Sequence, residues 1–299
     1  MQLARIPTPL VPLERLSRAL GAEIWCKRDD LTGIGLSGNK VRKLEFLLAE
    51  AKAQGADLLL TCGGIQSNHA RATAVAARQL GLDVELLLRG TPDDDPDGNL
   101  LLDHLLGARL HWCTPEDYRE RRDALLADLA AQRRREGRTP YVIPEGGSNA
   151  LGAKGYSAAA AEIGQRFDRV VVACGSGGTV AGLALGPDIG PIHGIAVCDD
   201  KAYFEGRIAR MDEAIPAPGG KWRIDEGFQG PGYGIANAEI WAGIRQMAEL
   251  EGLLLDPVYT GKAFWALRTR VAAREWTGRV LFWHTGGIFG LFGRGREIA

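Results

Sequence analysis

The chain has 299 residues, of which 45% are hydrophobic and 24% charged, as in globular proteins of one large or two smaller domains. Lys and Arg number 36 against 37 Asp and Glu, so no positive excess favours nucleic acid or an anionic membrane. No segment approaches the roughly 20 apolar residues that span a bilayer, and the N-terminus lacks a signal-peptide core. We therefore expect a cytoplasmic protein that acts on small molecules.

The five cysteines and five histidines suggest neither a disulfide framework nor a metal site. The cysteines are odd in number, form no CxxC pair and lie mostly in apolar runs, which favours reduced thiols. The histidines lack metal-ligand spacing among themselves or with cysteine. We therefore expect no metal ion.

Segments with strand-like and helix-like patterns alternate along the chain. In chain order, the patterns predict a helix over 41–55, a strand over 57–64, a helix over 70–81, strands over 84–90 and 108–114, a helix over 115–137, a strand over 141–147, and strands over 169–178 and 192–200 with a helix between them. Because the strands are apolar throughout, they predict parallel sheets that are covered by helices on both faces. The predicted fold class is therefore α/β.

A glycine-rich stretch, ACGSGGTVAGLA at residues 173–184, follows an apolar strand and opens a helix. Exposed amide N–H groups at such a helix start can hold a phosphate. The glycines also suit a dinucleotide, because Asp199 and Asp200 end the next strand about where an acid would bind a ribose. The motif alone leaves a phosphate monoester and a dinucleotide equally open.

Two further stretches join strands to helices. TCGGIQSNHAR brings Gln66, Ser67, Asn68 and His69 to a helix start, where they can bind a carboxylate or a ring hydroxyl. The alternative is that Ser67 or Asn68 only caps the helix. LFWHTGGIFG ends another strand at Thr285, whose hydroxyl can meet a ligand or close a turn.

Lys40 follows Gly38 and Asn39 at the start of the first predicted long helix. A lysine there can be held away from water and lose proton affinity, as Schiff-base lysines do. A pyridoxal phosphate site needs an amine for the aldehyde, amides for the phosphate, a polar group for the ring hydroxyl and a partner for the ring nitrogen. The sequence offers a candidate for each, which favours Lys40 as a nucleophile over an ordinary solvated charge.

Six motifs occur in order across nearly the whole chain: KRDDLTGIGLSGNKVRKLEFLL, GGIQSNHAR, GSGGT, GPGYGIAN, LLLDPVYTGKA and HTGG. Together they resemble the pyridoxal-phosphate enzymes of the 1-aminocyclopropane-1-carboxylate deaminase and D-cysteine desulfhydrase family. The resemblance implies a tryptophan-synthase-β-like, fold type II architecture with two doubly wound domains. It implies a large cofactor-binding domain from residues 1–42 and 147–299, a small domain from 43–146, and a homodimer.

The resemblance also implies roles for individual residues. Lys40 becomes the Schiff-base lysine, Asn68 the partner of the ring hydroxyl, and Ser67 a catalytic residue near the substrate carboxylate and the ring face. Tyr233 and Tyr259 become active-site phenols. The phosphate cup corresponds to Gly175, Ser176, Gly177, Gly178 and Thr179; Thr285 is a further cofactor contact; and the substrate contacts are Ser67, Asn68, His69, Tyr233 and Tyr259. This favours the phosphate monoester over the dinucleotide.

Two threonines distinguish the branches of the family. The deaminases typically have a glutamate after the tyrosine of DPVY and an apolar residue in place of Thr285, whereas here Thr260 follows Tyr259. A neutral hydroxyl near the ring nitrogen makes the cofactor a weaker electron sink, which suits the loss of a good leaving group. The resemblance therefore favours a desulfhydrase that converts a cysteine-like amino acid, preferentially D-cysteine, to pyruvate, ammonia and hydrogen sulfide. The alternatives are the deaminase reaction and a non-catalytic binding protein.

Overall fold

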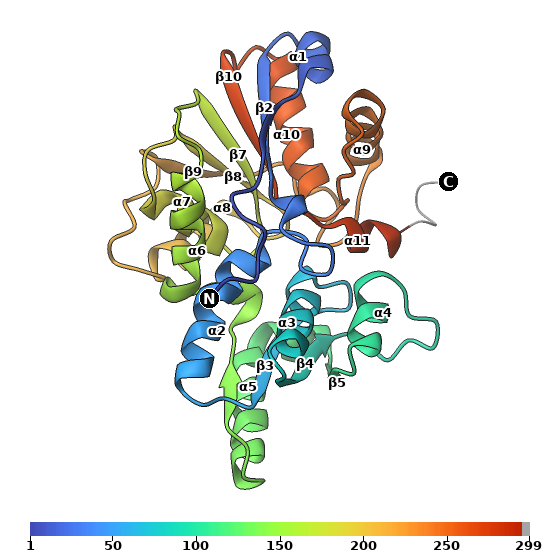
Figure 1. Ribbon diagram of the computed structural model, residues 1–299. Coiled ribbons are helices and arrows are strands. Elements are labelled where there is room, and N and C mark those ends of the chain that lie inside the picture. The colour runs from blue at the N-terminus through green and yellow to red at the C-terminus, as the bar shows by residue number, and fades with distance from the viewer. Residues whose placement is uncertain (295–299) are drawn as a thin grey trace.

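The computed structural model describes residues 1–294 and contains ten strands and eleven α-helices in that range (Figure 1). The strands are β1 (Leu10–Pro12), β2 (Glu23–Arg28), β3 (Leu58–Gly64), β4 (Asp83–Arg89), β5 (Arg109–Cys113), β6 (Pro140–Val142), β7 (Arg169–Cys174), β8 (Ile192–Ala196), β9 (Trp222–Asp225) and β10 (Arg279–His284). The helices are α1 (Glu14–Leu20), α2 (Lys40–Ala53), α3 (Asn68–Gln79), α4 (Gly98–Leu105), α5 (Pro115–Arg135), α6 (Ala150–Ala161), α7 (Gly178–Leu185), α8 (Lys201–Ala209), α9 (Ala238–Glu251), α10 (Thr260–Ala272) and α11 (Ile288–Phe292).

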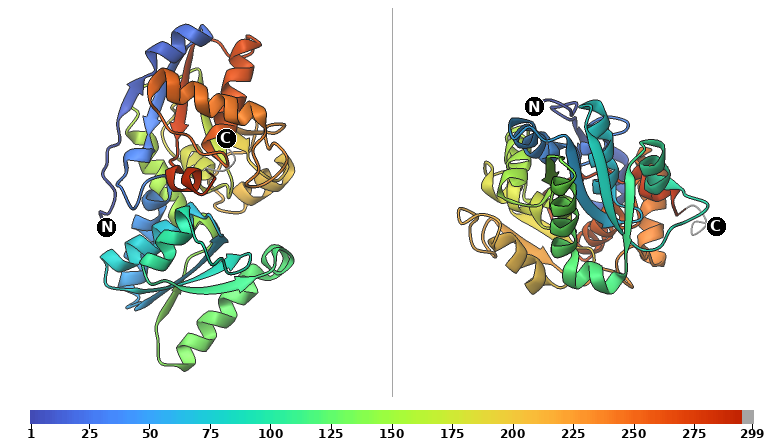
Figure 2. Two further views of the ribbon diagram at one scale, coloured as in Figure 1. Left: turned by 90° about the vertical axis from the view of Figure 1, so that its right-hand side faces the viewer. Right: turned by 90° about the horizontal axis from the view of Figure 1, so that it is seen from below.

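The strands form two sheets, which confirms the predicted α/β class. A six-stranded sheet has the order β1-β2-β10-β7-β8-β9, and a four-stranded sheet has the order β5-β4-β3-β6. Neighbouring strands are parallel throughout, except that β1 runs antiparallel to β2. The two sheets lie in separate lobes, with the four-stranded sheet at the bottom of the left view in Figure 2.

The chain passes from one lobe to the other and back. All strands of the four-stranded sheet lie between residues 58 and 142, whereas the six-stranded sheet combines strands from residues 10–28 and 169–284. The last strand, β10, pairs with both β2 and β7 inside the larger sheet. The division into domains at residues 42 and 147 stays a prediction.

The predicted strand over 141–147 is shorter in the structure. Its regular pairing, as β6, ends at Val142, and residues 145–147 form a 3-10 turn. Pro144 lies between them and has no N–H group with which to continue a ladder. The other predicted strands and helices are present and differ only at their ends.

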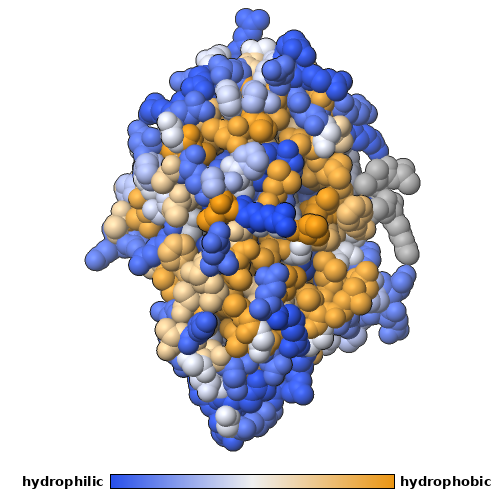
Figure 3. Space-filling model, in the orientation of Figure 1, coloured by the Kyte–Doolittle hydropathy of each residue, from blue (hydrophilic) through white to orange (hydrophobic). Residues whose placement is uncertain are grey.

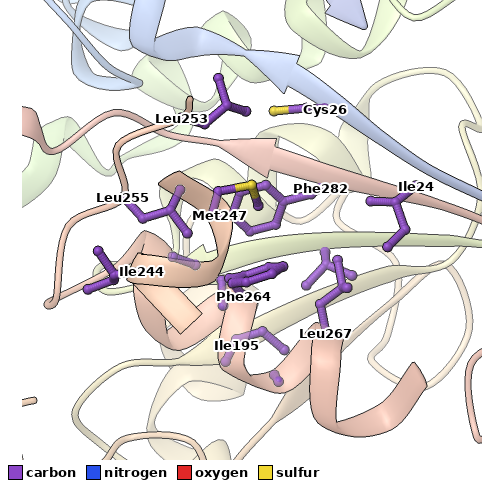
Figure 4. Packing of buried hydrophobic residues seen from close by; sticks show 14 of the residues in the cluster. Ile24, Cys26, Ile195, Ile244, Met247, Leu253, Leu255, Phe264, Leu267 and Phe282 are labelled. Carbon is purple, nitrogen blue, oxygen red and sulfur yellow. The ribbon is translucent and has the colours of Figure 1, made fainter. Parts of the chain in front are cut away.

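The six-stranded sheet packs one face against α9 and α10 through a continuous apolar core (Figure 4). Ile24, Phe282 and Ile195 project from three of its strands toward Phe264 and Leu267 on α10. All five side chains are fully buried, which explains the unbroken apolar runs in the sequence. None of the helices in residues 1–294 is long and apolar enough to cross a membrane.

A buried carboxylate, that of Asp29, connects distant parts of the chain. It accepts hydrogen bonds from Thr8 Oγ1 at 2.7 Å, Tyr156 Oη at 2.5 Å and Trp283 Nε1 at 2.8 Å. Arg42 adds two more, from Nε at 3.0 Å and Nη2 at 2.8 Å. Burial alone acts to raise the pKa of the Asp29 carboxyl, but Arg42 and the other donors outweigh it and hold that pKa below its usual value.

We expect Asp29→Asn to lower the free energy of unfolding by about 3–5 kcal/mol, because it leaves the buried Arg42 guanidinium without its main counter-charge. Asp30→Asn is the matched control, since Asp30 pairs with Arg28 near the surface and its loss should cost less than about 1 kcal/mol. Urea denaturation of both variants measures the difference. Equal losses of unfolding free energy in the two variants would show that the Asp29 cluster contributes no more to stability than the Arg28–Asp30 pair.

Candidate active site

The carboxyl ends of strands from both sheets meet at two adjoining cavities. Parallel strands place ligands at this edge, because their following loops and helix starts converge there. The larger cavity has a volume of about 560 Å³ and lies between the two lobes. A narrow cleft adjoins it, and both are lined by Lys40, Gly175, Ser176 and Tyr259.

Lys40 stands at the first position of α2, and the preceding loop is fixed against the end of β10. Gly38 has φ 110°, and a Cβ atom there would lie 2.7 Å from the Thr285 carbonyl oxygen, so only glycine fits. The Asn39 backbone N–H donates to that same carbonyl at 3.1 Å, and its side-chain amide donates to Thr179 Oγ1 at 3.0 Å. These contacts direct Lys40 toward the cavities.

The electrostatic setting of Lys40 favours a neutral amine. Burial lowers the pKa of Lys40 to about 8, and the negative charge of Glu145 acts in the opposite direction. One turn later, Lys43 is fully buried, and its Nζ donates to the Gly146 carbonyl at 2.8 Å and to Ser148 Oγ at 3.1 Å. Burial and the nearby Lys40 hold the pKa of Lys43 well below its ordinary value.

Lys43 is absent from the residues that the motifs single out. The signal that could have found it is spacing, because side chains three residues apart share one face of a helix. Its contacts with residues 146 and 148, more than one hundred positions away, cannot be read from local sequence.

The glycine-rich stretch 175–179 forms the turn between β7 and α7. The helix begins after Gly177 with no side-chain cap, so its first N–H groups are free to meet an anion. A Cβ atom on Gly178 would lie 2.5 Å from Ser148 Oγ, which shows how closely this turn packs. Ser176 Oγ and Ser148 Oγ are 2.8 Å apart. Gly175, Ser176, Gly177 and Thr179 line the narrow cleft.

The start of α3 brings Ser67, Asn68 and His69 together. Ser67 caps the helix by accepting from the Ala70 N–H at 3.1 Å, and it also lines the larger cavity; its role in ligand binding stays a prediction. Asn68 lines the narrow cleft and its Oδ1 accepts from Asn99 at 3.1 Å. His69 lines the larger cavity.

Two of these neighbours show features that the motif did not reveal. His69 Nε2 lies 2.9 Å from Thr61 Oγ1, and burial, with the charges of Lys40 and Lys43, keeps the pKa of His69 well below its ordinary value. Gln66 lines neither cavity; its side-chain oxygen instead accepts from the Asn99 N–H at 2.8 Å.

Tyr233 and Tyr259 form a pair in the wall of the larger cavity, with their hydroxyl oxygens 2.7 Å apart. Lys40 Nζ lies 6.0 Å from the centre of the Tyr259 ring. Burial raises the pKa of both phenols. The Tyr233 loop is tied down by Lys262, whose Nζ donates to the Gly232 carbonyl at 2.7 Å.

The two threonines near the predicted ring-nitrogen site differ in position. Thr285 lines the narrow cleft with Lys40. Thr260 lines neither cavity, because its hydroxyl donates to Asp256 Oδ1 at 2.7 Å and accepts from the Asp256 N–H at 2.8 Å. The same carboxylate accepts from the N–H groups of Val258, Tyr259 and Thr260 at the start of α10. The Thr260 hydroxyl therefore stabilises the turn at the start of α10 and does not face the cavities.

The residues around the cavities fit pyridoxal phosphate. The uncapped N-terminus of α7 supplies the amide cradle for a phosphate, Lys40 supplies an amine of reduced basicity, and Asn68 and Thr285 supply polar groups between them. Within residues 1–294, no cluster of His, Cys, Asp and Glu has the arrangement of a metal site.

Comparisons with known proteins agree with this chemistry. Residues 1–286 match the family model described as pyridoxal-phosphate dependent enzyme. The chain is 43% identical to the mitochondrial bifunctional D-cysteine desulfhydrase/1-aminocyclopropane-1-carboxylate deaminase of Arabidopsis thaliana, covering 99% of this chain and 80% of that protein. It is 42% identical to the D-cysteine desulfhydrase of Salmonella choleraesuis, covering 98% and 95%.

A solved structure of an ACC deaminase homologue, 39% identical, superposes with a TM-score of 0.91 over 100% of this chain and 94% of that one. The family model and the similar proteins cover nearly the full length of the chain, and the sequence motifs lie within the matched residues. The chain belongs to the family of pyridoxal-phosphate-dependent enzymes.

Proposed function

We propose that the protein catalyses α,β-elimination from a cysteine-like amino acid, preferentially D-cysteine, to give pyruvate, ammonia and hydrogen sulfide. The observation that carries the proposal is the position of Lys40, an amine with a pKa of about 8, beside an uncapped helix N-terminus and a pair of tyrosines. A binding protein needs neither a base of lowered pKa nor paired phenols.

Pyridoxal phosphate, when bound, condenses with amines and takes up the electron pair released at the substrate α-carbon. Lys40 Nζ would hold the cofactor, and as a free amine it would take the α-proton of the substrate as a general base. Ser67 and the N-terminus of α3 bind the substrate carboxylate, and Asn68 orients the cofactor ring. The cradle of residues 175–179 holds the phosphate.

Thr285 supports the choice of a good leaving group. It lines the cleft as a neutral hydroxyl, and we assign it to the ring nitrogen. A hydroxyl does not keep that nitrogen protonated as a carboxylate would. The site is therefore suited to a substrate whose β-substituent departs readily, such as a thiolate.

Ring opening of 1-aminocyclopropane-1-carboxylate is the second candidate. It is favoured by the names of the Arabidopsis relative and of the similar solved structure. We place it second because Thr260, and not the glutamate typical of the deaminases, follows Tyr259, and the cyclopropane substrate has no group to expel.

We further propose that the protein is a homodimer. Leu105 on α4 and Phe292 on α11 are 73% and 63% exposed, and these two helices pack together. Ile34, in the loop before Lys40, is 87% exposed. Figure 3 shows apolar surface over this part of the molecule, which a second copy would cover.

Borohydride reduction of the protein with its cofactor should fix the cofactor on Lys40, as peptide mapping by mass spectrometry detects. Lys40→Ala should lose both the modified peptide and the visible absorption band. Because burial lowers the pKa of Lys40 to about 8, the initial rate of recombination of cofactor-free protein with pyridoxal phosphate should rise with pH and level off above about 8.

Lys52→Ala, an exposed change on the same helix, should behave as wild type. A label on the buried Lys43 would overturn the assignment of Lys40. A recombination rate that keeps rising toward pH 10 would show an ordinary lysine.

Gly178→Ala should weaken binding of the cofactor roughly 10- to 100-fold, because it displaces the amides that would donate to the phosphate. Gly186→Ala at the other end of α7 is the control: its Cβ atom would also clash, 2.6 Å from Ala160 Cβ, but outside both cavities. Fluorescence titration of cofactor-free protein gives the affinities, and thermal melting reports stability. Equal losses of affinity would show that residues 175–179 are not the phosphate site.

Assays on D- and L-cysteine and on 1-aminocyclopropane-1-carboxylate test the reaction itself. We expect pyruvate from cysteine, faster from the D-enantiomer, and negligible 2-oxobutyrate from the cyclopropane. Lys40→Ala corrects for the slow reaction of cysteine with free cofactor. Equal or faster turnover of the cyclopropane would reverse the order of the two candidates.

A further inference from the structure

Three arginines line the larger cavity, and one of them differs from the others in its contacts. Arg119 pairs with Glu120, and Arg122 pairs with Glu145. Within residues 1–294, the Arg89 side chain takes part in no hydrogen bond or ion pair; its contacts are with two aromatic rings. A guanidinium has five N–H donors, so Arg89 has unused binding capacity.

Arg89 is held in place from both lobes. It ends β4, opposite Gly64 at the end of β3, so it lies at the carboxyl edge of the four-stranded sheet. Its guanidinium carbon is 5.3 Å from the centre of the Tyr118 ring and 4.8 Å from that of Tyr233. Two rings so close fix the position of a planar cation without neutralising it.

Glu145, a carboxylate in the wall of the same cavity, already accepts hydrogen bonds from three other side chains. Glu145 accepts from Tyr118 Oη at 2.8 Å, Arg122 Nη1 at 3.0 Å and Arg207 Nη1 at 3.1 Å. Arg89 therefore adds a positive charge to the cavity wall for which the described residues supply no partner. A partly buried cation of this kind is stabilised by an anion.

The place of Arg89 relative to Lys40 indicates which part of a ligand it meets. Tyr233 contacts Arg89 through its ring and Tyr259 through its hydroxyl, and Tyr259 in turn lies beside Lys40. The tyrosine pair therefore lies between Arg89 and Lys40. The larger cavity is lined by both Lys40 and Arg89, so a substrate that reacts at Lys40 can extend a β-substituent toward Arg89.

We propose that Arg89 binds a negatively charged group on the β-substituent, so that among S-substituted cysteines those whose substituent carries an anion are preferred over uncharged ones of the same shape. This inference rests on the proposed elimination. The α-proton passes to Lys40 Nζ, and its electron pair forms the Cα–Cβ double bond. The bond from Cβ to the substituent breaks, and its electron pair leaves with the substituent beside Arg89. With one water consumed overall, the products are pyruvate, ammonium and the protonated leaving group.

The test uses substrates that differ by one charge and otherwise have nearly the same shape. S-carboxymethylcysteine and S-carbamoylmethylcysteine, each as both enantiomers, are assayed for pyruvate formation by the holoenzyme. We expect the carboxylate to be preferred in kcat/KM. Arg89→Gln should reduce kcat/KM for the carboxylate about 10- to 100-fold and leave the amide within about threefold.

A binding measurement separates this inference from the proposed reaction. 2-Aminoadipate and its δ-amide copy the two substrates but carry carbon in place of the sulfur, so no leaving group can depart. Calorimetry on the holoenzyme should show the same preference for the charged ligand, lost in Arg89→Gln. Arg119→Gln, which removes an exposed arginine at the rim of the cavity, should keep it.

The possible outcomes are distinct. Selective binding without pyruvate from any substrate would overturn the elimination and uphold Arg89 as the anion site. Pyruvate formation with no charge preference, or equal losses for the acid and the amide in Arg89→Gln, would overturn the role of Arg89. No binding of either ligand would also overturn it.

Discussion

The buried ion pair between Asp29 and Arg42 is the constraint on which the geometry of the site depends. Asp29 lies at the start of the segment that leads to Lys40, and Arg42 lies two residues after that lysine. The pair therefore fixes both sides of Lys40 to one point. Tyr156 on α6 and Trp283 on β10 bind the same carboxylate, so that point belongs to the framework of the larger lobe. Because each charge is costly to bury alone, the pair specifies one arrangement more strongly than apolar packing would.

A second consequence of burial is seen at the amines. Lys40 and Lys43 lie one turn apart; burial lowers the pKa of both, and the charge of Lys40 also lowers the pKa of Lys43. Lys43 Nζ donates to a carbonyl and a hydroxyl, and none of residues 1–294 pairs a carboxylate with it to balance its charge. An anionic ligand would supply the balancing negative charge. The two anion sites that we propose, at the helix N-terminus of α7 and at Arg89, are consistent with this excess of positive charge.

Local patterns in the sequence were sufficient to predict the α/β class, because apolar strands, helical periodicity and glycine turns each depend on neighbouring residues. They also placed Ser67, Asn68 and the 175–179 turn at strand ends, which parallel strands bring to a common edge, and Lys40 at the start of a helix. The chemical roles of these residues stay predictions.

What the sequence could not reveal depends on contacts between distant residues. The stacking of Arg89 between Tyr118 and Tyr233 joins the two lobes, and no spacing rule connects those positions. Thr260 shows the opposite failure: it follows an active-site tyrosine in sequence, but the nearby Asp256 carboxylate turns its hydroxyl away from the cavities. A motif locates a residue along the chain but does not determine where its side chain points.

The position of β10 has a consequence for synthesis of the protein on the ribosome. This strand, from Arg279 to His284, follows both β2 and β7 in the chain and is made after them, yet it lies between them in the larger sheet. Until it emerges, β2 has no parallel neighbour, and the Asn39 N–H lacks its acceptor on Thr285. The nascent chain therefore cannot complete the surroundings of Lys40 until β10 has been made and has inserted between β2 and β7.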